Sequence, residues 1–254
     1  MSNLLEINNL SVDFPSRRGQ VAAVNKVSIE VAKGEVLGLV GESGAGKSTV
    51  GNSIINLLEP PGYISGGEII FDGARIDQLS NEEMRKIRGA KIGTIFQDPQ
   101  TSLNPLMTIG KQLSETLIET LKISGSSARE KAIELLDSVG IPEPEARLDA
   151  YPHQFSGGMR QRVVIALALA GDPDLIIADE PTTALDVSIQ KQILDLIKSL
   201  CKQRNLGVII VTHDIGVIAE IADRVAVMYN GQLVEQGKVT QVLQKPKHEY
   251  TKSL

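Results

Sequence analysis

The sequence contains no tryptophan, and aromatic residues make up only 3% of its 254 residues. Proteins that bind single-stranded nucleic acid usually stack the bases on aromatic side chains, so this scarcity disfavours that class. The chain also lacks a long run of Lys and Arg, and its formal net charge is −5. Because nucleic-acid binding depends on clustered positive charge, we expect no nucleic-acid partner.

Cysteine and long apolar segments are equally scarce. Cys201 is the only cysteine, which excludes an internal disulfide and fits a reducing compartment; we expect it to be a semi-buried thiol on a helix. The longest apolar run, Val163 to Ala170, falls far short of the roughly 18 residues that a membrane span needs. No basic segment followed by an apolar one opens the chain, so we expect a protein that is not secreted.

The remaining composition is that of an ordinary globular protein, with 42% hydrophobic and 22% charged residues. The length suits one large domain or two small ones. A continuous apolar run at Val36–Val40 predicts a strand buried on both faces. A glycine-rich loop follows, and the apolar spacing then predicts a helix from Lys47 to Leu58. Strand, loop and helix in this order indicate an α/β fold.

The rest of the chain divides into a β-rich beginning, a helical middle and a mixed end. Alternating apolar residues in the first thirty positions predict an antiparallel β region, and Ser80 with Glu83 resembles a helix start. We expect further strands at 66–73, 92–96, 175–178, 208–211, 225–228 and 232–234, and helices at 109–123, 128–139, 159–170 and 188–203. The block at roughly 98–170 therefore reads as an inserted helical subdomain.

The loop after the first buried strand matches the phosphate-binding pattern G-x-x-x-x-G-K-[ST]. Glycines allow backbone N–H groups to surround phosphates, and the following helix N-terminus adds partial positive charge. Lys47 would reach the β- and γ-phosphates, and the Ser48 hydroxyl would ligate Mg²⁺. The structural alternative is a glycine-rich turn with a surface lysine. The predicted nucleotide contacts are Gly41, Ser43, Gly44, Ala45, Gly46, Lys47, Ser48 and Thr49.

Two carboxylates, Asp179 and Glu180, end the apolar run at 175–178. If this strand lies parallel to Val36–Val40, both carboxylates reach the phosphate edge of the sheet. Asp179 would then hold Mg²⁺ through water, and Glu180 would polarise the attacking water. The alternative is that the pair only caps a helix or a turn.

A second glycine pair precedes a strong helix at Ser156-Gly157-Gly158. It predicts a second anion-binding helix N-terminus, which one nucleotide does not need but a dimer sharing nucleotides does. The segment Phe155–Arg162 resembles the signature motif of ATP-binding-cassette (ABC) ATPases. Phe155 and Met159 depart from that motif, whereas the serine and both glycines are kept.

The resemblance to ABC ATPases extends to other motifs. It implies an α/β P-loop NTPase core of the RecA-like type, and ATP hydrolysis with Mg²⁺. Gln97 resembles the glutamine that contacts Mg²⁺ and senses the membrane partner, and Asp186, in Ala184-Leu185-Asp186, belongs to a loop at the dimer interface. His213 resembles the switch histidine that contacts the γ-phosphate, although a lone histidine after a strand is usually structural. We expect His153 and His248 to be structural.

The same resemblance implies an aromatic residue that stacks on adenine near the start of the chain. Phe14 is the best candidate. Arg17 or Arg18 would be alternatives, because an insertion at Pro15–Arg18 lies nearby. Phe14 as a core residue is the structural alternative.

Within the ABC family, the chain resembles the peptide/nickel importer branch. The resemblance rests on 95–105, 151–162, 178–186 and 246–251, and is strongest to the first of two ATPase subunits of dipeptide or oligopeptide importers. It implies membrane permease subunits, a homodimer or a heterodimer with a second ATPase subunit, an extracytoplasmic solute-binding protein, and a peripheral place on the cytoplasmic face of the inner membrane. Tandem ATPases have similar N-terminal halves.

Members of this branch continue past the segment equivalent to Tyr250-Thr251, some with cysteines for an iron–sulfur cluster, so we expect this chain to be a truncated form. Two other functions stay open. A cassette ATPase of DNA repair or translation usually carries long coiled-coil or basic insertions, and none is visible in the sequence. A regulatory dimer that binds ATP without turnover is disfavoured by Glu180 and His213.

Overall fold

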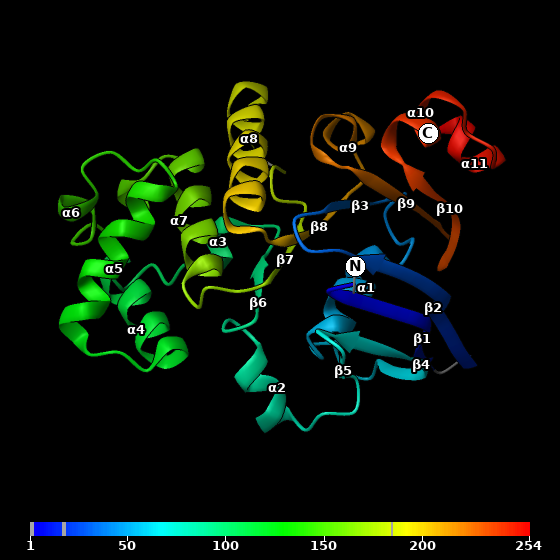
Figure 1. Cartoon of the computed structure of the whole chain (residues 1–254), viewed down its shortest axis with the longest axis horizontal. Helices are drawn as coiled ribbons and strands as arrows, with labels where there is room; N and C mark the ends of the chain where they lie inside the picture. The colour runs from blue at the N-terminus through cyan, green and yellow to red at the C-terminus, as the bar shows by residue number, and fades with distance from the viewer. Residues whose placement is uncertain (1–2, 17–18, 184) are drawn as a thin grey trace. The chain divides into compact units, whose positions relative to one another are not determined.

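The computed structural model describes residues 3–16, 19–183 and 185–254 (Figure 1). The chain forms two compact units. One comprises Met1–Arg85 with Leu200–Leu254, and the other comprises Lys86–Ser199. The second unit thus contains the predicted helical block together with a strand on each side of it. The finer boundaries of that block, at residues 98 and 170, stay a prediction.

The first unit opens with the predicted antiparallel sheet, in which the strands follow the order β2-β1-β4-β5. Apolar residues such as Leu5 and Ile7 face its buried side. A register shift after Ile7 accommodates Asn9, whose φ is +51°, and returns Leu10 to the buried face. The strands are β1 Leu5–Ser16, β2 Gly19–Val31, β4 Tyr63–Phe71 and β5 Ala74–Arg75.

A second group of strands in the first unit positions the candidate nucleotide site. β3 (Val36–Val40) is buried along its whole length and lies parallel to β8 (Gly207–Thr212) and β9 (Arg224–Tyr229). β10 (Gln232–Lys238) closes this group antiparallel to β9. Val40 pairs with Thr212, so β3 and β8 end at the same edge. Whatever follows these two strands is therefore brought to one place.

Several helices of the first unit differ from expectation. α1 ends at Ile54 rather than Leu58, because Asn56 adopts a left-handed backbone (φ +50°) that stops the helical hydrogen bonding. The predicted start at Ser80 is confirmed, since the Ser80 hydroxyl accepts the Glu83 N–H at 3.3 Å. Three short helices near the C-terminus were not predicted. The helices are α1 Lys47–Ile54, α2 Asn81–Ile87, which crosses into the second unit, α9 Ile215–Ile221, α10 Val239–Gln244 and α11 Glu249–Ser253.

The second unit packs helices against a parallel pair of strands. β6 (Ile92–Ile95) pairs with β7 (Leu175–Asp179), and Gly93 lets the α7 backbone approach β6 at Ala168. α4, α5 and α7 form at the three predicted helical segments and pack on one another. The helices are α3 Pro99–Ser102, α4 Ile109–Leu121, α5 Gly125–Ser138, α6 Pro144–Arg147, the 3-10 turn η1 Pro152–Gln154, α7 Gly157–Leu169 and α8 Val187–Arg204, which continues into the first unit.

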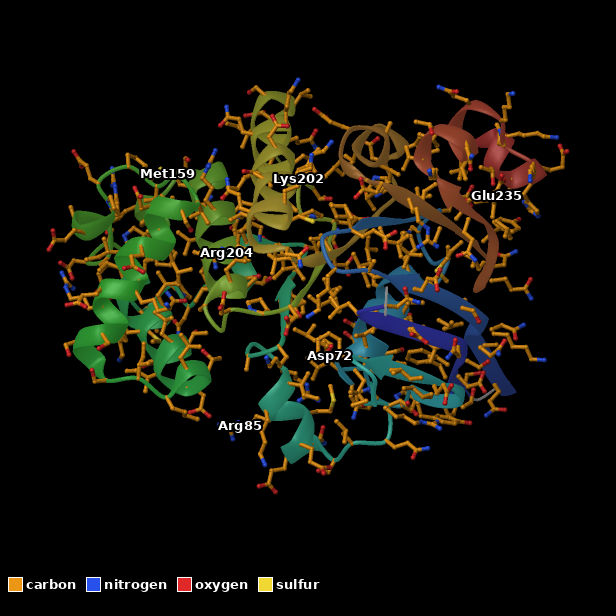
Figure 2. All side chains as sticks on the ribbon, in the orientation of Figure 1. Asp72, Arg85, Met159, Lys202, Arg204 and Glu235 are labelled. Atoms are coloured by element: carbon orange, nitrogen blue, oxygen red, sulfur yellow. The ribbon has the colours of Figure 1, made fainter. Side chains whose placement is uncertain are left out.

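The single cysteine, Cys201, lies near the C-terminal end of α8. Lys202 and Arg204 occupy the last turn, where positive charge complements the helix dipole (Figure 2). The Cys201 thiol, one residue before Lys202, is buried and donates to the Leu206 carbonyl at 3.0 Å. Burial raises the pKa of this thiol to about 11, so it stays protonated at neutral pH and is a structural residue, as expected.

Among the described residues, no helix is both long enough and apolar enough to cross a membrane.

Candidate functional site

The N-terminus of α1 offers backbone donors to an anion. Gly46 is its N-cap, and within the described part of the chain no side chain caps this end. The first helical bond runs from the Val50 N–H to the Gly46 carbonyl at 3.0 Å. The N–H groups of Lys47, Ser48 and Thr49 precede that bond, and such groups at a helix start are oriented towards phosphate in anion sites.

The Lys47 side chain is folded over this loop. It is 6% exposed, and its ammonium donates to the Gly41 carbonyl at 2.8 Å and to the Glu42 carbonyl at 2.9 Å. A buried ammonium group lies next to backbone N–H donors that no side chain caps, among the residues described. This combination makes the loop strongly attractive to a negatively charged group.

Two glycines of the loop are required by close approach. A Cβ on Gly41 would collide with the Met228 carbonyl oxygen, and one on Gly46 would collide with that of Ala23. Gly46 also has φ +95°, which side chains rarely adopt. Between them, the Ala45 N–H donates to the Glu42 carbonyl at 3.1 Å, which closes the turn containing Ser43 and Gly44.

His213 lies at the edge where β3 and β8 end. It follows Thr212, whose hydroxyl accepts the Asp214 N–H at 3.0 Å. The Asp214 carboxylate in turn caps α9 by accepting the Gly216 N–H at 2.7 Å. These contacts fix an exposed His213 in the turn between strand and helix. The structure thus brings His213 and the phosphate loop to the same edge.

Phe14 lies on β1, opposite Val21, and is half-buried. Its ring packs on the backbone of Gly62, because a Cβ there would meet ring atoms of Phe14. The ring is therefore neither fully exposed nor part of the fully buried core, and its proposed stacking on adenine stays a prediction. The alternatives Arg17 and Arg18 lie outside the described residues.

In the second unit, Glu180 stands directly after β7 and Asp179. Its backbone is left-handed, with φ +46°. Its Oε2 accepts the Gln97 side-chain N–H at 3.0 Å and the Thr183 hydroxyl at 2.8 Å. The structure thus brings together Gln97 and Glu180, which lie 83 residues apart in sequence.

Thr183 is a site residue that the sequence reasoning missed. Its N–H also donates to the Glu180 carbonyl, at 3.1 Å, so one tight turn supplies both contacts. The available signal was a hydroxyl residue three positions after a strand-end carboxylate, a spacing that suits such a turn.

The glycine pair of the second unit lies in the first turn of α7, which begins two residues before the predicted start at residue 159. Ser156 is the N-cap, and its hydroxyl accepts the Met159 N–H at 3.3 Å. A Cβ on Gly157 would make ordinary contact with Leu185 at 3.6 Å, whereas one on Gly158 would crowd Ile189 at 2.7 Å. Asp186 is exposed at the start of α8, and its carbonyl accepts the Ile189 N–H at 2.9 Å. Ala184 lies outside the described residues.

The role of Ser48, Gln97 and Asp179 as metal ligands stays a prediction. Among the described residues, no group of three or more His, Cys, Asp or Glu side chains could hold a metal ion. A hydroxyl, an amide oxygen and a carboxylate, from Ser48, Gln97 and Asp179, are hard oxygen donors of the kind that Mg²⁺ accepts when phosphates complete its shell. The donor set therefore fits Mg²⁺ delivered with a nucleotide, and it does not fit an all-protein metal cage.

Comparison with known proteins gives consistent matches. The family model described as "ABC transporter" matches residues 24–183. An oligopeptide transport ATP-binding protein of Bacillus subtilis is 54% identical over 99% of this chain and 70% of its own length. A dipeptide transport ATP-binding protein of the same organism is 51% identical over 100% of this chain and 76% of its own length.

Solved structures agree with the sequence matches. A dimeric ATP-binding cassette in a post-hydrolysis state, bound to ADP and phosphate, superposes with a TM-score of 0.81 at 33% identity, covering 92% of this chain and 98% of the other. A cassette from Clostridium perfringens, part of an ABC transporter complex, superposes with a TM-score of 0.83 at 29% identity, covering 96% of this chain and 92% of the other.

Proposed function

The chain belongs to the ABC transporter family, and on this premise we propose that it is the ATP-hydrolysing subunit of an importer for dipeptides or oligopeptides. The observation that carries the proposal is sequence identity of 50% or more, over nearly the whole chain, to ATP-binding proteins of oligopeptide and dipeptide transport. The buried Lys47 over an uncapped helix start supports nucleotide binding, and the held carboxylate of Glu180 supports hydrolysis.

The phosphate loop binds the triphosphate. N–H groups at the start of α1 donate to phosphate oxygens, and the Lys47 ammonium, now on two loop carbonyls, neutralises charge that develops on the γ-phosphate. Phe14 stacks on adenine. His213 donates to the γ-phosphate, and its place at the shared end of β3 and β8 supports this role.

Ser48, Gln97 and Asp179 would hold Mg²⁺, Asp179 through a water molecule, and the bound ion would supply electrostatic stabilisation of the phosphate charge. The side-chain nitrogen of Gln97 faces Glu180, so its amide oxygen is the atom of this residue that ligates the ion.

Glu180 is the general base. Its carboxylate accepts a proton from the attacking water as the oxygen forms its bond to the γ-phosphorus, and the bond to the bridging oxygen of ADP breaks. Gln97 and Thr183 hold the carboxylate in position by donating to the same oxygen. Catalysis by this set is mainly positioning and electrostatic stabilisation.

The chain functions as a dimer, with itself or with a second ATPase subunit. Gly157, Gly158 and Ser156 contact the nucleotide held by the partner, and Asp186 lies at the dimer interface. A solved cassette at 33% identity is dimeric and holds ADP and phosphate, which supports this arrangement. One nucleotide site is therefore completed by two chains.

The dimer acts on permease subunits at the cytoplasmic side of the inner membrane, and a solute-binding protein delivers the peptide from outside the cytoplasm. Apolar side chains exposed in the second unit support a protein partner there: Leu106 is 86% exposed and Phe96 is 46% exposed. Both flank the segment that begins with Gln97, the residue proposed to sense the permease.

Phosphate release is the deciding measurement. We expect ATP hydrolysis by the chain to rise when reconstituted permease subunits are added, and to be unaffected by DNA or RNA. Stimulation by nucleic acid would instead favour a repair or translation ATPase. Binding of ATP without any turnover, with permease present, would favour a regulatory dimer.

A further inference from the structure

A tyrosine from the end of the chain contacts the phosphate loop. The Glu42 N–H donates to the hydroxyl of Tyr250 at 2.8 Å, across 208 residues of sequence. Tyr250 lies on α11 and is only 9% exposed. Glu42 is one of the variable positions of the loop motif, so the motif itself does not predict this contact.

The contact completes the support of a single peptide group. The carbonyl of Gly41 and the N–H of Glu42 belong to the same planar unit. The carbonyl accepts the Lys47 ammonium at 2.8 Å, and the N–H donates to Tyr250. The peptide at the entrance of the loop is therefore held from both sides, and one of its two holders is the predicted phosphate-binding lysine.

Tyr250 is itself fixed in place. Its ring packs against that of Tyr229, with a centroid distance of 4.3 Å and an interplanar angle of 32°. Its own N–H donates to Nδ1 of His248 at 3.2 Å, so His248 has the structural role expected from the sequence. Because Tyr229 ends β9, the ring is anchored to the strand that runs beside β3.

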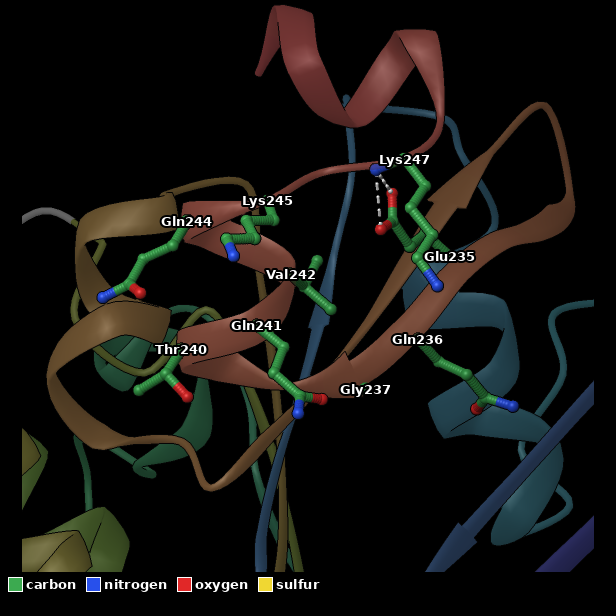
Figure 3. Close-up of a pocket in the computed structure, with 9 residues that line it drawn as sticks. All are labelled: Glu235, Gln236, Gly237, Thr240, Gln241, Val242, Gln244, Lys245 and Lys247. Carbon is green, nitrogen blue, oxygen red and sulfur yellow. Dashed lines mark hydrogen bonds between the residues drawn. The ribbon is translucent and has the colours of Figure 1, made fainter.

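A further anchor lies one step earlier in the chain. The Glu235 carboxylate, on β10, accepts the Lys247 N–H at 2.9 Å and the His248 N–H at 3.0 Å. Figure 3 shows the Glu235–Lys247 bonds among the residues that line a pocket of about 510 Å³ beside β10 and α10. These bonds fix the segment that leads into α11, and with it the position of Tyr250.

We propose that Tyr250 is a positioning residue for nucleotide binding: its hydroxyl holds the Gly41–Glu42 peptide in the conformation in which the loop receives phosphate. The proposal deepens the proposed function, since it assumes that the loop binds ATP. A loop that is ordered before binding loses less conformational entropy when the nucleotide arrives. Burial raises the pKa of the Tyr250 phenol, so the hydroxyl stays neutral at physiological pH.

The proposal makes the C-terminal segment part of the nucleotide site. Displacement of Tyr250 by any event at residues 246–251 would release one side of the loop peptide and lower the affinity for ATP. The alternative is that Tyr250 only fills space beside Tyr229. In that case its hydroxyl would be dispensable.

Tyr250→Phe separates the two, because it removes the hydroxyl and keeps the ring. The measurements are the dissociation constants of ADP and of a non-hydrolysable ATP analogue by calorimetry, the KM and kcat of hydrolysis, and the melting temperature. We expect both dissociation constants and KM to rise about two- to tenfold, the range for one lost hydrogen bond, with kcat changing less than twofold. Tyr229→Phe is the matched control, and it should leave all of these values near wild type.

A second variant tests whether Glu235 influences nucleotide binding by fixing the position of Tyr250. Glu235→Ala removes the acceptor for the Lys247 and His248 N–H groups, so it should weaken nucleotide binding in the same direction. If Glu235 acts through Tyr250, the double variant with Tyr250→Phe should bind about as weakly as Tyr250→Phe alone. Fully additive losses would mean that the anchor does not act through the tyrosine.

The outcomes distinguish this proposal from the proposed function. Nucleotide binding by Tyr250→Phe at wild-type affinity, or a lower melting temperature with unchanged KM and dissociation constants, overturns the role of Tyr250 only. A wild-type chain that binds no adenine nucleotide would overturn the proposed function itself.

Discussion

Glu180 combines an uncommon backbone with a carboxylate held by two donors. A left-handed φ of +46° on a residue other than glycine costs about 1 kcal/mol or more, and such conformations persist where the surroundings enforce them. Here the turn to Thr183 and the contact with Gln97 enforce it. The backbone points the carboxylate at a defined place immediately after β7, as a general base requires.

Glu180→Gln tests that role directly. The carboxamide still accepts a hydrogen bond but is a poor proton acceptor, and the phosphate loop is untouched. We expect ATP affinity within about threefold of wild type and kcat lower by about 10²- to 10⁴-fold, the usual contribution of a general base. Steady-state phosphate release and nucleotide titration give both values. Glu145→Gln, at an exposed position of α6, is the control, and wild-type turnover by Glu180→Gln would refute the assignment.

Thr183→Val tests whether the Thr183 hydroxyl holds the proposed general base, Glu180, in position. Valine keeps the shape of threonine but cannot donate to Glu180 Oε2, which leaves Gln97 as the remaining donor of the two. We expect kcat to fall about tenfold with little change in KM, because the loss concerns orientation of the base and not nucleotide binding. Thr183→Ser keeps the hydroxyl and should restore most of the rate. Equal kcat for the valine and serine variants would remove Thr183 from the site.

At the scale of helices and strands, the sequence predicts an element well where its pattern of apolar residues is long and regular. α4, α5 and α8 repeat their apolar residues over several turns, α7 carries the long apolar run 163–170, and β3 and β8 are unbroken apolar runs. All were predicted to within a few residues. α9, α10 and α11 are too short to show a period, and they form because tertiary packing and caps such as Asp214 and His248 complete them.

The candidate site divides in the same way. The phosphate loop, Glu180 and the glycine pair belong to local motifs, so the neighbouring residues in the sequence are enough to predict them. Thr183 and Tyr250 act through contacts that only the folded chain creates, one in a tight turn and one across 208 residues. No local pattern encodes the second of these.

The N-terminus of α7 allows a direct test of the proposed sharing of active sites between two chains. Gly158→Asp would place a negative charge near the partner's γ-phosphate, but a Cβ at this position also crowds Ile189 of the same chain at 2.7 Å. Gly157 meets Leu185 at an ordinary 3.6 Å, and an aspartate in the first turn suits the helix dipole. Gly157→Asp therefore adds the charge without disturbing the fold.

We expect Gly157→Asp to abolish most ATPase activity through repulsion of the partner's nucleotide, while the neutral Gly157→Asn retains much more. Mixing Gly157→Asp with Lys47→Ala, which disables its own loop, should restore activity in up to half the sites of each mixed dimer. The same design applies with a second ATPase subunit as partner, each change being placed on one subunit at a time. Absence of recovery in verified mixed dimers would exclude sharing.

At the scale of the whole molecule, residues proposed for the chemistry occur in both units. The first unit contributes Lys47, Ser48 and His213, and the second contributes Gln97, Glu180 and the α7 N-terminus. If the chain drives a permease, as proposed, hydrolysis must be linked to movement of the permease, and the exposed apolar side chains of the second unit make that unit the candidate docking surface. Gln97 is a poor probe of that linkage, because it donates to Glu180 and its substitution would disturb the base as well.

Leu106 is a better probe, because an apolar side chain that is 86% exposed contributes little to folding. If it docks on a permease subunit, Leu106→Glu should lower peptide uptake and permease-stimulated hydrolysis by about tenfold or more, the range for an interface anchor. Basal hydrolysis by the isolated chain should stay within twofold of wild type, because no proposed catalytic group is altered. Ile118→Glu, at a 41% exposed apolar position of α4, is the matched control for adding a charge to the second unit. Uptake at the wild-type level with Leu106→Glu would place the docking surface elsewhere, whereas equal losses of basal and stimulated hydrolysis would mean that the substitution acts on the site and not on the permease contact.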